Sequence, residues 1–75
     1  MFVQAQLMSG QVLSFDFGKG FQYNVKKLRI TLSQQLRKLP NRIVIARGED
    51  GEFAIVDDQE ILVENEKYVV FVNVV

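Results

Sequence analysis

Side chains that perform nucleophilic or metal chemistry are scarce in this sequence. The 75 residues include no His and no Cys, which removes Ser-His-Asp and Cys-His catalytic sites as well as thiolate and imidazole metal sites. Ser9, Ser14 and Ser33 have no evident general base. The adjacent carboxylates Asp57 and Asp58 stand in a polar stretch, where neighbouring acids are usually solvated or cap a helix. We therefore predict that the protein is not an enzyme.

Two glycine-containing segments are candidates for ligand loops but lack the necessary spacing. Gly18-Lys19-Gly20 is not a phosphate-binding loop, because the pattern GxxxxGKS/T is absent. The acidic segment Glu49-Asp50-Gly51-Glu52 lacks the ligand spacing of a calcium loop. The sequence thus predicts no cofactor and no bound metal.

Charged residues balance overall but are separated along the chain. Nine basic and nine acidic residues give a formal net charge of zero. All basic residues except Lys67 lie at or before residue 47, and all acidic residues except Asp16 lie at or after residue 49. Opposed patches would give a dipolar surface that steers and orients a partner. The plainer interpretation is a solvated basic helix beside acidic turns.

The first 17 residues predict a β-hairpin. Phe2 to Leu7 and Gln11 to Phe17 each alternate apolar and polar side chains, which gives a strand one apolar face. Met8-Ser9-Gly10-Gln11 lies between them and supplies a glycine for a turn that needs a positive φ.

A helix is expected after the hairpin. Apolar residues recur there at spacings of three and four along one stripe: Val25, Leu28, Leu32, Leu36 and Leu39. Asn24 can cap the start, and Pro40 follows the expected end. The competing interpretation makes Leu28, Ile30 and Leu32 one face of a strand, with a short helix from Ser33. Ile30 lies opposite the helical stripe and is the residue that the helix fits least well.

The second half of the sequence predicts three further strands. Arg42 to Arg47 and Phe53 to Val56 flank the Asp-Gly turn, and Asp57 to Glu66 is polar and loop-like. Tyr68 to Val72 is apolar at every position, as expected for a central strand covered on both faces. Strands gathered around one helix indicate an α+β fold.

Length and composition indicate one domain that spans residues 1–75. The chain is 48% hydrophobic and 24% charged, which is typical of a folded globular domain. The absence of cysteine favours a reducing compartment. There is no basic and apolar leader at the N-terminus and no run of apolar residues long enough for a membrane span. We expect a cytoplasmic or nuclear location and no membrane partner.

The order hairpin, helix, strand, short strand, loop and final strand resembles ubiquitin and the ubiquitin-like β-grasp domains. Ser9-Gly10-Gln11 is similar to ubiquitin's Thr-Gly-Lys turn, and Arg42-Ile43-Val44-Ile45-Ala46 to its Arg-Leu-Ile-Phe-Ala strand. Asp57-Asp58-Gln59-Glu60-Ile61 is similar to its Ser-Asp-Tyr-Asn-Ile segment. The resemblance covers nearly the whole length. It implies a mixed four- to five-stranded sheet packed on one helix.

The resemblance also implies a surface for protein partners. Ubiquitin's Leu-Ile-Val binding patch would correspond to Met8, Val44 and Val70, with Tyr68 beside them and Arg42 and Arg47 at the rim. A slip of one residue in the last strand would expose Val69 and Phe71 instead. The sequence ends without the Gly-Gly tail that conjugation requires, so we expect a non-covalent interaction module.

Two other branches of the fold offer alternative functions. The acidic residues Glu49, Asp50, Glu52, Asp57 and Asp58 are similar to the acidic motif of Phox/Bem-type domains, which assemble head to tail with a basic patch. That resemblance implies salt-sensitive self-association, and we expect either a monomer or a chain that self-associates weakly. Ile43 to Val72 also resembles the end of doublecortin-type domains, which implies microtubule binding through a basic helix. Nucleic-acid binding through the same helix is disfavoured by the zero net charge.

Overall fold

Two strands at the start of the chain form the predicted hairpin. The computed structural model describes residues 1–19, 22–49 and 51–73. Strand β1 (Phe2–Leu7) pairs antiparallel with β2 (Val12–Asp16). Gly10 has a φ of 92° in the turn and donates its N–H to the carbonyl of Leu7 at 2.9 Å. A side chain at Gly10 would be strained in that left-handed conformation.

Helix α1 (Val25–Leu36) follows, and its residues are not a strand. Asn24 caps the start, because its side chain accepts a hydrogen bond from the N–H of Lys27 at 3.2 Å. The end of the helix differs from the prediction. Arg37 takes a left-handed conformation, and the N–H of Lys38 turns back to the carbonyl of Ser33. Leu39 therefore leaves the helical stripe and is exposed.

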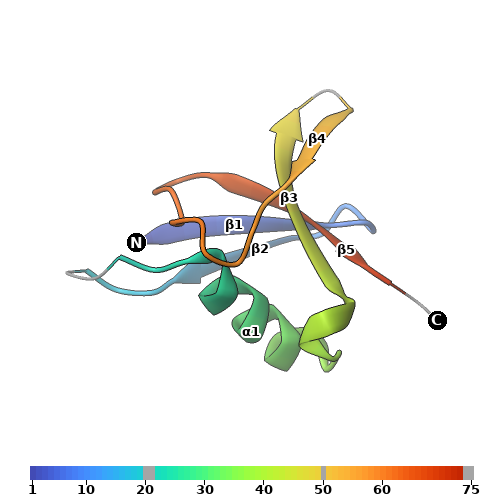
Figure 1. Cartoon of the computed structure of the whole chain (residues 1–75), viewed down its shortest axis with the longest axis horizontal. Helices are drawn as coiled ribbons and strands as arrows, with labels where there is room; N and C mark the ends of the chain where they lie inside the picture. Colours follow the sequence, from blue (N-terminus) through green and yellow to red (C-terminus); the bar gives the residue numbers. More distant parts are fainter. Residues whose placement is uncertain (20–21, 50, 74–75) are drawn as a thin grey trace.

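The remaining strands complete one five-stranded mixed sheet in the order β2-β1-β5-β3-β4. A short 3-10 turn at Pro40–Arg42 leads into β3 (Ile43–Glu49), which forms a hairpin with β4 (Glu52–Ile55). The last strand, β5 (Lys67–Val72), lies in the centre, parallel to β1 and antiparallel to β3. The helix crosses one face of this twisted sheet (Figure 1).

The hydrophobic core lies between the helix and the inner face of the sheet. The helix contributes the three buried residues of its stripe, and the strands contribute alternate residues that are almost fully buried: Val3, Ala5, Ile43, Ile45, Tyr68 and Val70. Leu62 closes the core from the loop before β5, whereas its neighbours Ile61 and Val63 are exposed. The phenolic oxygen of Tyr68 accepts the N–H of Val63 at 3.1 Å, so this core tyrosine has a polar partner.

One arginine fastens the helix to the sheet. The Nε of Arg29 lies 2.7 Å from Oδ1 of Asp58, and its Nη1 donates to the carbonyls of Pro40 and Ile43. Its side chain is only 19% exposed. Arg29 therefore joins the helix, the loop before β5 and the start of β3, and it is not part of a free basic face.

Candidate binding surface on the outer face of the sheet

The sheet has a second face, opposite the helix, and this outer face carries an apolar surface. Alternate residues of β3, β4 and β5 point to it. We define the outer patch as the five large apolar residues of these three strands that share this face: Val44, Phe53, Ile55, Val69 and Phe71. Val44, Val69 and Phe71 are half-buried, whereas Phe53 and Ile55 are 48% and 74% exposed.

An aromatic contact holds the patch together. The rings of Phe53 and Phe71 meet edge to face, with centroids 6.0 Å apart and an interplanar angle of 77°. Ala46 lies on the same face, opposite Val69 and Ile55 in the ladder, and is fully buried. The outer patch is therefore an apolar cluster that packs through these two rings and around the buried Ala46.

Gly48 allows the β3–β4 hairpin to take its shape. Its φ is 146°, and a Cβ at this position would lie 1.9 Å from the carbonyl oxygen of Glu52. Any side chain at Gly48 would thus push β4 away. The position of Phe53 relative to Phe71 depends on this close approach of two backbones.

The predicted register of the last strand is wrong by one residue. Tyr68 and Val70 were expected on the exposed face, but they are 1% and 0% exposed and belong to the core. The physical reason is the pairing of β5 with β3, which sets Val70 opposite Ile45 and Phe71 opposite Val44. Because successive strand residues alternate between faces, this register turns Val69 and Phe71 outward, as the alternative slip predicted.

The other predicted patch residues are spread out. Val44 lies on the outer face. Met8 is 71% exposed in the β1–β2 turn, where it borders an apolar hollow of about 310 Å³ at the end of the core. Arg42 lies just before β3 and Arg47 lies near the end of β3, so the two arginines stand at opposite ends of this strand.

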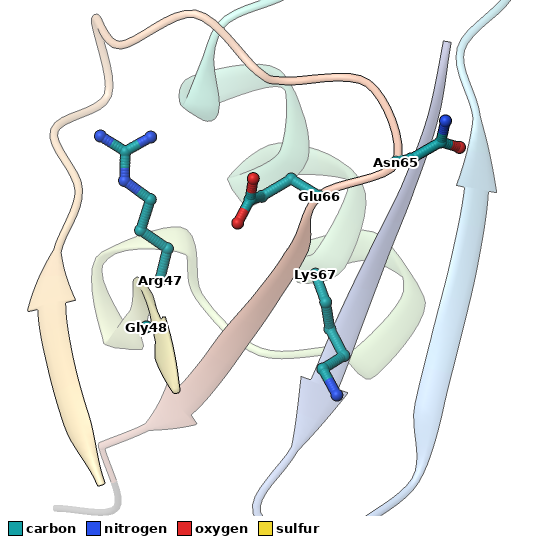
Figure 2. A pocket seen from close by; sticks show the side chains of 5 residues that line it. All are labelled: Arg47, Gly48, Asn65, Glu66 and Lys67. Carbon is teal, nitrogen blue, oxygen red and sulfur yellow. The ribbon is translucent and has the colours of Figure 1, made fainter. Parts of the chain in front are cut away.

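A polar hollow adjoins the outer face at the start of β5. It has a volume of about 440 Å³ and is lined by Arg47, Gly48, Asn65, Glu66 and Lys67. Figure 2 shows the Glu66 carboxylate on the side of Arg47, Lys67 extending down the face and Asn65 pointing away. Arg47 also lies 3.5 Å from Glu60. Charges of both signs meet here, which suits the polar rim of a protein contact.

The predicted acidic site is divided in the structure. Glu49 and Glu52 pair at the tip of the β3–β4 hairpin, and the side chain of Glu49 and the whole of Asp50 lie outside the described residues. Asp57 and Asp58 lie elsewhere, at the start of the helix, where the carbonyl of Asp58 accepts the N–H of Lys26. The carboxylate of Asp58 pairs with Arg29.

Sequence reasoning missed Phe53 and Ile55 as members of the patch. Their alternation with Glu52 and Ala54 placed them on a common face of a strand. The face to which that strand turned them was not readable, because it depends on the pairing with β3. The signal was thus present, but its meaning required the tertiary structure.

The residues that the structure describes hold neither a cluster of metal ligands nor a membrane-spanning helix. In these parts of the chain, no group of three or more His, Cys, Asp and Glu side chains is arranged to hold a metal ion. Neither described helix has the length and apolar character needed to cross a membrane.

Comparison with known proteins supports the fold. No protein-family model and no curated protein matches this sequence. Among solved structures, the chain is similar to the solution structure of the N-terminal ubiquitin-like domain in the 4931431F19Rik protein, with a TM-score of 0.77 and 19% identity. The match covers 99% of this chain and 75% of that one. Together with the sheet order and the single crossing helix, it shows a ubiquitin-like β-grasp fold, as the sequence predicted.

Proposed function

We propose that this ubiquitin-like β-grasp domain is a non-enzymatic module that binds a protein partner non-covalently through the outer patch. The observation that carries the proposal is the packed apolar cluster on a sheet face that the helix leaves open. Contiguous exposed apolar surface of this kind marks interaction sites in soluble proteins. Placement in the cytoplasm or nucleus belongs to the same proposal and follows from the lack of cysteine.

The patch has the layout of a small protein interface. Phe71, Val69 and Val44 form its centre, and the more exposed Phe53 and Ile55 form one side. Aromatic anchors in such centres contribute most of the binding free energy, while polar rims set orientation and association rate. The hollow beside Lys67 and Glu66 supplies a polar rim at the start of β5.

The charge-based alternatives have less support. Arg29 and Arg47 are engaged by Asp58 and Glu60 within the molecule, so part of the separated charge is already neutralised. Of the acidic residues predicted to act together, the described ones lie in two places, Glu49 and Glu52 at the hairpin tip and Asp57 and Asp58 beside the helix. Head-to-tail assembly, microtubule binding and nucleic-acid binding each need a concentrated field of one sign, and each is reduced by salt.

The test is affinity capture from lysate with three folded proteins in parallel: the wild type, Val44→Asp and Val12→Asp. Val12 lies on the same outer face but at the β2 edge, and it is 45% exposed. It therefore controls for a new carboxylate on that face outside the patch. We expect the captured partner to be lost with Val44→Asp, to be kept with Val12→Asp and to withstand moderate salt.

Two outcomes would contradict the proposal. Retention of every partner by Val44→Asp would show that the patch is not the contact surface. Partners that are released by moderate salt from all three proteins would move the search to the charged surfaces, beginning with Lys26, Lys27, Arg37 and Lys38. Amide dispersion in an NMR spectrum establishes that each variant is folded before it is used.

A further inference from the structure

At the outer edge of β2, a regular row of backbone groups has no hydrogen-bond partner among the residues that the structure describes. Hydrogen bonds between Phe17 and Met1 and between Leu7 and Gln11 fix which residues of the hairpin face each other across the ladder. In an antiparallel pair, alternate residues direct both their N–H and C=O groups toward the neighbour. Val12, Ser14 and Asp16 alternate with the residues of β2 that bond to β1, so their own backbone groups point away from β1. Because β2 ends the strand order, no described strand meets them.

Beside this edge lies a row of apolar side chains that the core covers incompletely. Leu13, Phe15 and Phe17 point to the inner face and are half-buried. The helix packs closest to β3, toward the other side of the sheet, which leaves this row partly open. Phe15 and Phe17 have parallel rings with centroids 6.0 Å apart. A strand added beside β2 would therefore gain both backbone hydrogen bonds and apolar contact.

The opposite edge of the sheet does not offer the same combination. The hydrogen bond from Val56 to Ile45 fixes the β3–β4 pairing and leaves the backbone groups of Phe53 and Ile55 on the free side. The inward-facing residues of β4, Glu52 and Ala54, are exposed and offer little apolar area on the inner face. Its outward-facing residues, Phe53 and Ile55, belong to the outer patch, which the proposed protein partner covers. The contrast between the two edges identifies β2 as the one suited to pairing.

We propose that the β2 edge pairs with the same edge of a second copy of this chain, antiparallel and centred on Ser14. A two-fold axis at Ser14 sets Val12 opposite Asp16 of the other copy and gives about six backbone hydrogen bonds, two for each of the three facing pairs. The same axis sets Leu13 opposite Phe15 in the closely spaced non-hydrogen-bonded pairs. Aliphatic–aromatic pairs at such sites are favourable, and this register forms two of them.

The low charge of the β2 edge is compatible with a second copy as the partner. The small contact area indicates how strong the dimer is. The sequence Gln11 to Phe17 has one charged side chain, Asp16. That carboxylate lies 3.5 Å from the N-terminal ammonium of its own molecule, so two edges meet without a strong like-charge repulsion. A contact limited to one short strand and one row of side chains is at the small end of protein interfaces, roughly below 1,200 Å². The dimer is therefore weak, and because its contacts are backbone and apolar, it tolerates salt.

The experiment measures self-association of the whole chain up to millimolar concentration. Sedimentation velocity gives the apparent mass, and amide hydrogen exchange reports protection of Val12, Ser14 and Asp16. We expect the mass to rise with concentration equally at low and high salt. We expect exchange at these three amides to slow at the same time, which tests the surface without any substitution.

Two variants sharpen the test. Ser14→Pro removes one outward N–H without breaking a bond to β1. Ser14→Ala is the matched control, because it changes the same side chain and keeps that N–H. We expect at least a tenfold weaker dimer for Ser14→Pro and an unchanged dimer for Ser14→Ala. A constant mass and constant exchange in the wild type would overturn the proposal. So would association found only at low salt, because that result would indicate head-to-tail charge pairing instead.

Discussion

The two faces of the sheet carry similar side chains, but the inner face is buried and the outer face is partly exposed. On β3 and β5, Ile45 and Val70 are fully buried beneath the helix, whereas Val44 and Val69 next to them in the sequence face outward. The residues are nearly the same chemically, so hydrophobicity does not distinguish them. They differ because successive strand residues point to opposite faces of the sheet and the helix packs on only one of those faces. An apolar strand residue thus acquires a structural or an interaction role from its position in the fold.

The largest expected effect contrasts two neighbouring valines. Val70→Ala removes buried methyl groups from the core and is expected to lower the free energy of unfolding by about 1.5–3 kcal/mol. Val69→Ala changes the half-buried outer face and is expected to cost less than about 1 kcal/mol. Chemical denaturation of both variants measures the difference. Equal losses would show that the outer face is as structural as the inner one.

Next in size is the fastening of the helix to the inner face. Arg29→Ala removes the ion pair with Asp58 and the hydrogen bonds to the carbonyls before and within β3. Hydrogen bonds to charged groups contribute about 1.5–3 kcal/mol each, and we expect a total loss in that range. Arg37→Ala is the control, since Arg37 is an exposed residue at the helix end. Similar melting temperatures for the two variants would contradict this role of Arg29.

The polar end of Tyr68 tests whether the inner face depends on a single hydrogen bond. Tyr68→Phe keeps the ring in the core but leaves the N–H of Val63 without its partner. We expect a loss of about 1 kcal/mol in the free energy of unfolding, as for a typical hydrogen bond. Amide exchange at Val63 should accelerate in parallel. Unchanged protection of that amide would mean that the bond is not significant.

The smallest expected effect concerns the pH dependence of the free energy of unfolding, through the carboxyl group of Asp16. The pKa of Asp16 is lowered, first by a hydrogen bond from the N–H of Gly18 and then by the N-terminal ammonium. A carboxyl whose pKa is lower in the folded state adds stability above its unfolded pKa, and loses that contribution as pH falls through the folded pKa. Asp16→Asn keeps an acceptor but cannot ionise. We expect this variant to show a slightly weaker loss of stability between neutral and acidic pH.

That acid prediction is checked by urea unfolding at several pH values. Asp16 is exposed, so its effect stays small beside those of the core residues. Identical pH profiles for the wild type and Asp16→Asn would show that ionisation of Asp16, beside the N–H of Gly18 and the N-terminal ammonium, adds no measurable stability.

Local sequence rules determined most of the elements. The alternation in the first 17 residues gave the hairpin, and the stripe from Val25 to Leu36 with its Asn24 cap gave the helix. These signals are readable because strand and helix periods act over a few residues. The end of the helix was missed because the left-handed residue that ends it is Arg37, and not the glycine that usually marks such an end in a sequence. The order and spacing of the elements predicted the ubiquitin-like β-grasp fold, and the structural comparison confirmed it.

The tertiary structure decided which residues form the surface. In the uniformly apolar stretch from Tyr68 to Val72, either parity is compatible with the sequence, and only the pairing with β3 selects one. The same holds for Arg29, whose partners lie 11 to 29 residues away in the chain. Sequence by itself determined the periodicity of each element, because periodicity is local. Register and the choice of partners are contacts between distant segments, so only the folded arrangement could decide them.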